Sequence, residues 1–175
     1  MSERPLPPVD RAAAAAAQWR RERPDLDAFP MELLGRLGEL AGVITTQWTG
    51  PLFARFGLHR GEFDVLATLR RAGDPYALTP KQLIEQTMIT SGGMTSRIDR
   101  LVVAALVERR PDIRDRRGTL VALTTNGLMR IDAMMAAHVA NEQRVLLPLS
   151  AAEQHQLNGL LTKWLAGLHL LDPED

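Results

Sequence analysis

Residues 78–124 read LTPKQLIEQTMITSGGMTSRIDRLVVAALVERRPDIRDRRGTLVALT. The start of this stretch predicts a short helix over 79–86. Thr79 is a suitable N-cap, Pro80 fits the first helical position, and Gln82 completes a capping box with Thr79. The stretch decides the fold because the helix and the two strands that follow also have clear sequence signals.

A second helix is predicted from about Ser91 to Ala105, with Thr90 or Ser91 as its N-cap. Its apolar residues recur at helical spacing and form an inward face: Met94, Ile98, Leu101, Val102 and Ala105. The outward face of its N-terminal part carries small or short polar residues: Ser91, Gly92, Thr95, Ser96 and Asp99. One face of this helix is therefore expected to pack in the protein core. Its N-terminal turn carries only small side chains, so a binding partner can approach it closely.

Two strands are predicted at 106–110 and 119–123, joined by an arginine-rich loop. A helix-turn-helix followed by such a basic β-wing can place one helix in the major groove of DNA and the loop near the neighbouring groove. Residues 91–117 contain seven arginines and four acidic residues, a net charge of +3 within a chain whose net charge is zero. This local charge favours phosphate contacts. A solvated charged loop is the alternative interpretation.

The composition is that of an ordinary globular protein, with 175 residues, 45% hydrophobic and 24% charged. No run of about 18 apolar residues predicts a membrane span, and the N-terminus lacks a signal-peptide core, so we expect a cytoplasmic protein without membrane contact. Without cysteine there is no disulfide and no thiolate metal site. The histidines lack ligand spacing and no nucleophile–base set is visible. We therefore expect no metal, no cofactor, no catalytic residue and no enzyme activity.

Further helices are predicted on both sides of this stretch, at about 11–23, 31–56 and 61–71, from Thr124 or Thr125 to Leu147, and after a capping box at Ser150. The expected fold class is mainly α with a small β-wing, a winged helix-turn-helix with terminal helices for dimerisation. Apolar stripes are expected in the helix at 31–56 (Leu33, Leu37, Leu40, Ile44 and Trp48) and in the last helix (Leu157, Leu160, Leu161, Trp164, Leu165 and Leu168). These stripes suggest more burial than one small domain offers, which favours a homodimer; an intramolecular bundle is the alternative.

The segments SGGMTSRIDRL at 91–101 and DIRDRRG at 112–118 resemble the MarR family of bacterial winged-helix transcription regulators. The resemblance extends over about 31–170 and is densest at 63–127. Ala105 differs from the glycine that the family often has before the first wing strand. The resemblance implies one MarR-type domain over 1–175, with the winged helix-turn-helix at 58–124.

In such a domain, the helices of 11–57 and 125–171 would form the dimerisation region. The resemblance implies a homodimer that binds a palindromic operator in double-stranded DNA and usually represses. Twofold symmetry would then space the half-sites by about 10 bp or a multiple of that.

The segments WRRERPDLD at 19–27 and GRL at 35–37 look like the urate-responsive PecS-type branch of this family, which has an added N-terminal helix. That resemblance implies a ligand site built from Trp19, Asp64, Arg97 and Arg109. Core packing is the alternative role for Trp19. A structural ion pair is the alternative role for Asp64 and Arg97, because a buried carboxylate needs a partner.

The residues expected to bind DNA are Ser91, Gly92, Gly93, Thr95, Ser96, Arg100, Arg114, Arg116 and Arg117. Short hydroxyl side chains can approach base edges, and the two glycines let the backbone approach phosphate. Helix capping is the alternative role for the hydroxyl residues, and Arg100 either contacts phosphate or pairs with an acidic residue. Arg114 and Arg116 are expected at the wing tip, near a minor groove. Arg117 either pairs with Asp115, which shapes the wing, or touches DNA.

These observations predict a DNA-binding regulator, a repressor that a small aromatic anion such as urate releases from its operator. The alternatives are a MarR-type regulator that responds to another phenolic or aromatic ligand or to none, and a winged helix used for protein contact. An enzyme is disfavoured.

Overall fold

The computed structural model describes residues 10–87, 93–112, 115 and 118–171, and the chain divides into two compact units, Met1–Arg55 and Phe56–Asp175. Most described residues are helical, and the remainder include a small antiparallel sheet, so the expected fold class is confirmed. Across the described ranges, no helix combines the length and the apolar character that a membrane span needs. The division at residue 55 lies close to the expected start of the winged helix-turn-helix at residue 58.

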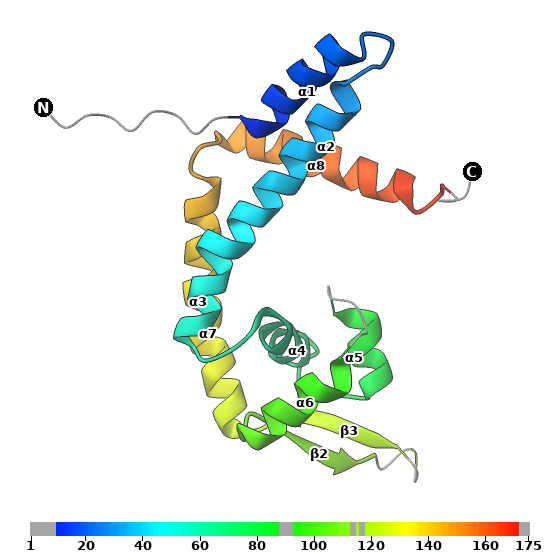
Figure 1. The fold of residues 1–175 in the computed structure, drawn as a ribbon. Helices are drawn as coiled ribbons and strands as arrows, with labels where there is room; N and C mark the ends of the chain where they lie inside the picture. The colour runs from blue at the N-terminus through cyan, green and yellow to red at the C-terminus, as the bar shows by residue number, and fades with distance from the viewer. Residues whose placement is uncertain (1–9, 88–92, 113–114, 116–117, 172–175) are drawn as a thin grey trace, which may run out of the picture. The chain divides into compact units, whose positions relative to one another are not determined.

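The first unit consists of α1 (Arg11–Glu22) beside a long helical run (Figure 1). That run comprises α2 (Phe29–Val43), the π-helical segment η1 (Ile44–Thr49) and α3 (Gly50–Arg55). It matches the single long helix expected over 31–56, except that six residues at its centre form wider π-type turns. The backbone N–H of Gly50 donates to the carbonyl of Thr45 there, five residues back.

Small residues and surface ion pairs hold α1 against α2. Ala16 is buried, and a Cβ added at Gly35 would lie 3.4 Å from the Cβ of Ala12, so the two backbones approach closely. Three ion pairs join α1 or its N-cap to α2: Arg11–Glu39, Arg20–Glu32 and Arg36–Asp10. A fourth, Arg36–Glu32, lies within α2. Hydrogen bonds from Arg20 and then Arg36 lower the pKa of the Glu32 carboxyl. This contact therefore combines close packing of small residues with ion pairs at its edge.

The second unit begins with α4 (Arg60–Arg71), α5 (Pro80–Gln86) and α6 (Met94–Val103), with α4 in contact with both of the others. The sheet has the order β1-β3-β2, where β1 is Ala77–Leu78, β2 is Val107–Pro111 and β3 is Thr119–Leu123. β2 and β3 form the wing hairpin beside α6 (Figure 1), with Val107 opposite Leu123 and Pro111 opposite Thr119. The sequence predicted both wing strands within one residue and missed β1.

The core of the second unit lies between α4, α5, α6 and the sheet. Its fully buried apolar side chains include Val65, Leu66, Leu69, Leu83, Val107 and Val121. The predicted inward face of α6 is confirmed at Met94, Ile98 and Leu101, all buried, whereas Val102 is half-buried and Ala105 exposed. The core thus fixes which side of α6 faces outward.

Three helix starts follow the predicted capping residues, and one does not. Thr79, Thr124 and Ser150 each accept a hydrogen bond from a backbone N–H in the first turn of the following helix. The helix α6, in contrast, begins at Met94 and has Gly93 as its N-cap, with φ +77°. The prediction of Thr90 or Ser91 as the cap was therefore wrong, and both residues lie outside the described ranges. Gly93 suits this position because glycine adopts left-handed backbone angles without steric cost.

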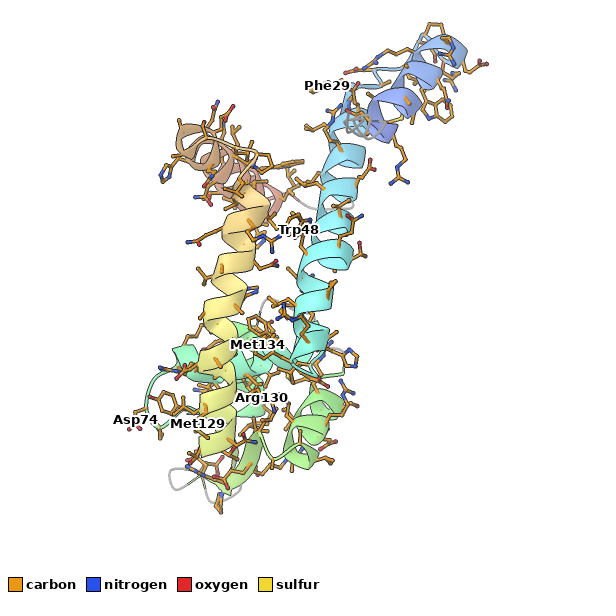
Figure 2. The ribbon with its side chains drawn as sticks, turned by 90° about the vertical axis from the view of Figure 1, so that its left-hand side faces the viewer. Phe29, Trp48, Asp74, Met129, Arg130 and Met134 are labelled. Atoms are coloured by element: carbon orange, nitrogen blue, oxygen red, sulfur yellow. The ribbon has the colours of Figure 1, made fainter. Side chains whose placement is uncertain are left out.

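The last two helices are α7 (Thr125–Leu146) and α8 (Ala151–Leu168). The start of α7 packs closely on the wing, because a Cβ added at Gly127 would overlap the Leu106 carbonyl oxygen. On α7, Met134 is buried and Met129 exposed (Figure 2). No residue of α8 is buried within the chain. The apolar stripe that was expected on the last helix is therefore not covered within a single chain.

Candidate DNA interface and ligand site

The outward face of α6 is the candidate recognition surface. Thr95 and Ser96 are exposed at its first turn, on the side opposite the buried Met94 and Ile98. Gly93, also expected near DNA, is exposed just before the helix. Ser91 and Gly92 lie outside the described residues. The described part of this surface is therefore accessible and free of bulky side chains.

An ion pair between a buried carboxylate and a half-exposed guanidinium ties α6 to α4. The Nε of Arg100 donates to Oε1 of Glu62 at 2.5 Å, and the other carboxylate oxygen of Glu62 accepts from the backbone N–H of His59 at 2.9 Å. The Glu62 side chain is only 7% exposed, whereas that of Arg100 is 54% exposed. Burial by itself raises the pKa of Glu62, but the hydrogen bonds from Arg100 and from the His59 amide outweigh it, so the pKa lies below its ordinary value. Arg100 thus takes the acid-pairing role that was one of its two predicted alternatives.

Sequence reasoning missed Glu62. The signal that could have found it is its position three residues after His59, at the start of a helix, where a glutamate reaches back to the N-cap amide. Its second partner is 38 residues away in sequence, so no local pattern indicates it.

Another ion pair connects the recognition helix to the wing. Arg109 on β2 donates to Asp99 on α6 at 2.7 Å, and both side chains are substantially exposed. On the same strand, Arg110 pairs with Glu108. Arg109 was expected to bind a ligand; in the structure it links the wing hairpin to the helix beside it.

The wing loop closes around Gly118. Its backbone N–H donates to the Asp115 carbonyl at 2.8 Å, and its own carbonyl accepts from the backbone N–H of Asp112 at 3.0 Å. A Cβ at Gly118 would lie 3.0 Å from the Asp112 Cβ and 3.1 Å from the Asp115 Cβ, tighter than ordinary packing. Arg114, Arg116 and Arg117 fall outside the described residues.

The expected ligand residues are divided between the two units. Trp19 lies in the first unit, on α1, and is 46% exposed. In the second unit, the Arg97 side chain lies directly over Gly61 on α4, where an added Cβ would be 2.5 Å from Nε. Asp64 is half-buried on the same helix, one turn further along. The structure therefore brings Arg97 against the helix that carries Asp64.

A pocket of about 410 Å³ lies within the second unit, on the opposite end of α6 from its N-cap. Its lining includes Glu62 and Arg100, together with Arg130 of α7, which sequence reasoning did not single out. None of the residues expected to bind a ligand lines it. Among the described residues, no group of three or more histidine and acidic side chains is arranged to hold a metal ion.

Comparison with known proteins adds three findings. A sequence model of the MarR family matches residues 56–118. The HTH-type transcriptional regulator PecS of Dickeya dadantii (strain 3937) is 41% identical over 144 residues, which covers 82% of this chain and 86% of PecS. The multiple antibiotic resistance protein MarR of Escherichia coli (strain K12) is 33% identical over 94 residues, 54% of this chain and 63% of MarR.

Solved structures agree with this fold. A mutant MarR from E. coli in complex with operator DNA has a TM-score of 0.67 and 28% identity, covering 84% of this chain and 97% of MarR. Bordetella bronchiseptica BpsR, whose structure is described as explaining regulation of DNA binding by 6-hydroxynicotinic acid, has a TM-score of 0.59 and 27% identity, covering 75% of this chain and 95% of BpsR.

Proposed function

Because this chain belongs to the MarR family of DNA-binding transcriptional regulators, we propose that it binds a palindromic operator as a homodimer and is released by a small aromatic anion, with urate the first candidate. Members of this family are regulators rather than enzymes, in agreement with the function class predicted from sequence. The observation that carries the proposal is the exposed start of α6, which the buried Glu62–Arg100 pair and the Arg109–Asp99 pair fix to its neighbours on two sides.

The exposed apolar residues of α2 and α8 support the homodimer. Leu160 and Leu165 are 58% and 59% exposed, and Leu37 and Leu40 on α2 are also exposed. Monomeric soluble proteins rarely leave so many large apolar side chains in water, so a second copy of the chain is the simplest cover. A twofold dimer would present two α6 helices to half-sites about 10 bp apart or a multiple of that.

The position of Arg97 supports a ligand-controlled recognition helix. Arg97 belongs to α6 and packs on α4 near Asp64, so an anion that binds the Arg97 guanidinium would compete with its contacts to α4. Such a ligand would also repel the Asp64 carboxylate. A ligand of this kind shifts the DNA-binding equilibrium only through different affinities for the competent and incompetent states.

A different ligand is the second candidate. The similarity to BpsR, whose DNA binding is regulated by 6-hydroxynicotinic acid, favours a planar heteroaromatic acid as an alternative to urate. A MarR-type regulator that responds to another phenolic or aromatic compound, or to none, remains the alternative that the experiment separates.

The experiment is a gel shift with the DNA upstream of this protein's own gene, in the presence and absence of urate. We expect a protein–DNA complex that urate dissociates. Trp19→Phe combined with Asp64→Asn should leave the shift intact and blunt the urate response. If urate leaves the complex intact, Trp19, Asp64, Arg97 and Arg109 have structural roles only. If no complex forms even at low salt, where phosphate contacts are strongest, the proposed binding to this DNA is wrong.

A further inference from the structure

The helix α1 packs on α2 with little apolar burial (Figure 1). Ala16 is the buried residue of α1, and Ala12 and Ala13 are half-buried. Trp19, the large apolar residue of this helix, is exposed. Because the alanine side chain is small, its burial removes little apolar surface from water. Apolar packing within the chain therefore holds α1 only weakly.

Charged contacts at both ends of α1 add to its attachment. Arg11 pairs with Glu39 near the start of the helix, and Arg20 pairs with Glu32 near its end. The arginine side chains of both pairs are at least half exposed to water. Exposed ion pairs are weak, and dissolved salt weakens them further because it screens the charges. The attachment of α1 to α2 should therefore weaken as the salt concentration rises.

Asp10, just before α1, contributes both to the helix and to its attachment. One of its carboxylate oxygens accepts from the backbone N–H of Ala13 at 2.9 Å, and the other accepts from Nη2 of Arg36 on α2 at 2.8 Å. These hydrogen bonds, from Ala13 first and then from Arg36, lower the pKa of the Asp10 carboxyl. An isolated helix of about 12 residues is marginal in water even when it is rich in alanine. When α1 leaves α2, it should therefore also lose much of its helical hydrogen bonding.

The connector between α1 and α2 has contacts of its own. Residues 23–28 form this connector, and Phe29, labelled in Figure 2, begins α2. Arg23 pairs with Asp25 inside the connector, and Asp27 accepts from the backbone N–H of Phe29. These contacts join near neighbours in the sequence, so α1 can leave α2 without breaking them. The connector is therefore suited to act as a hinge.

From these contacts we infer that α1 is a detachable strap, which docks on α2 through its ion pairs and thereby positions Trp19 for the proposed aromatic ligand. Glu32 is the positioning residue, because it holds Arg20, the direct neighbour of Trp19. The ligand part of this inference rests on the proposed function, whereas the docking of α1 does not. A ligand that contacts Trp19 in the docked position stabilises the docked state, and salt opposes that state.

Amide hydrogen exchange of the full chain, followed by mass spectrometry, measures docking without a substitution. The reference is α4, which contributes fully buried residues to the core of the second unit. We expect the amides of α1 to exchange at least about tenfold faster than those of α4. Raising the salt concentration from about 0.05 M to about 0.5 M should accelerate α1 by about threefold or more and α4 by less than about twofold. Exchange of α1 as slow as that of α4, or unchanged by salt, would overturn the strap.

An engineered disulfide can hold the strap closed, because the chain contains no cysteine. A Cβ added at Gly35 would lie 3.4 Å from the Cβ of Ala12, close to the separation of about 3.5–4.5 Å across a disulfide. We expect the oxidised form of the variant with Ala12→Cys and Gly35→Cys to show slow exchange of α1 that salt does not accelerate. The reduced form is the matched control and should behave as the wild type. Equal exchange of α1 in the two forms would mean that the helix does not undock.

If this disulfide does not form, Glu32→Gln tests the same attachment. It removes the charge that Arg20 and Arg36 both contact, and we expect the exchange of α1 at low salt to rise by about threefold or more. The matched control is Glu22→Gln, which removes the same charge from an exposed residue of α1 that has no ion pair with α2 in the described part of the chain. It should change the exchange by less than about twofold. Equal effects of the two substitutions would contradict the positioning role of Glu32.

The ligand part of the inference is tested by the gel shift with urate. The oxidised form of the disulfide variant should release DNA at a urate concentration about three- to tenfold lower than the reduced form, because Trp19 no longer has to be ordered when the ligand binds. The same urate concentration for both forms would overturn the control of Trp19 by the strap. If urate releases DNA from neither form, the ligand part falls together with the proposed urate response. The exchange measurements still decide whether α1 undocks.

Discussion

The helices α6 and α8 both carry an apolar stripe, yet only α6 covers its stripe within the chain. Met94, Ile98 and Leu101 of α6 are buried against its neighbours, whereas Leu160 and Leu165 of α8 are more than half exposed. An apolar stripe predicts that one face of a helix is buried. It does not predict whether the same chain or a second chain buries that face. The apolar face of α6 is covered within one chain, whereas the apolar residues of α8 stay exposed in it.

The sharpest test of this comparison is Leu160→Asp combined with Leu165→Asp. We expect a monomer by sedimentation velocity, because two charges would lie in the proposed dimer interface. Operator affinity should fall on the order of 10²–10⁴-fold, since two half-sites would no longer be bound by one particle. The circular dichroism of the helices of the second unit should change little. A dimer that survives both substitutions would place the interface elsewhere.

A second contrast lies between the ion pairs of the two units. Arg100→Met would leave the buried Glu62 carboxylate with only the His59 amide as its donor, and we expect the free energy of unfolding to fall by roughly 1–3 kcal/mol in urea titrations. Arg36→Met removes an arginine from the exposed Asp10 and from the half-buried Glu32, which keeps Arg20 as a partner, so its effect should be smaller. Equal effects would mean that α1 is held to α2 as firmly as α6 is held to α4.

The pH dependence of stability should also differ between the Glu62–Arg100 pair and the ion pairs of the first unit. The folded-state pKa of Glu62 lies below its ordinary value, so its contribution is complete above the unfolded pKa and is lost as the pH falls through the folded pKa. Between about pH 7 and about pH 3.5, the wild type should therefore lose more stability than Glu62→Gln. The pKa of Glu32 is also lowered, by hydrogen bonds from Arg20 and then Arg36, so Glu32→Gln should reduce the acid loss as well, but by less than Glu62→Gln because Glu32 is more exposed to water. Parallel curves for Glu62→Gln and the wild type would assign the acid loss to other carboxyls.

The features that the sequence predicted correctly are those that local chemistry encodes. Thr79, Thr124 and Ser150 cap helices because the partner amide lies three residues away. The strand β1 was missed because its two residues become a strand only by pairing with β3, more than 40 positions along the chain. The Glu62–Arg100 pair and the pocket beside it depend in the same way on distant segments coming together.

The sequence predicted which residues of the candidate DNA interface are exposed, but not which residues their side chains pair with. Thr95, Ser96 and Gly93 are exposed as expected, because helical periodicity fixes which face of α6 points away from the core. Helical periodicity does not predict which acidic residue pairs with a given arginine. The ion-pair partners of Arg100 and Arg109 were therefore identified only in the structure.

The smallest predicted effect concerns Ala105, the residue that departs from the glycine of the family. It adopts φ +55°, in the left-handed region where an alanine Cβ crowds the backbone. Ala105→Gly removes about 1–2 kcal/mol of this strain but gives the unfolded chain more freedom, so we expect a net gain of about 0.5–1 kcal/mol in unfolding free energy. Ala104→Gly, at the preceding residue in an ordinary helical conformation, is the matched control and should destabilise the protein. Because Ala105 connects the tightly packed α6 to the wing, the gain should appear in the unfolding of the second unit and leave dimer dissociation unchanged; a loss of stability would mean that the alanine methyl group makes contacts worth more than the strain.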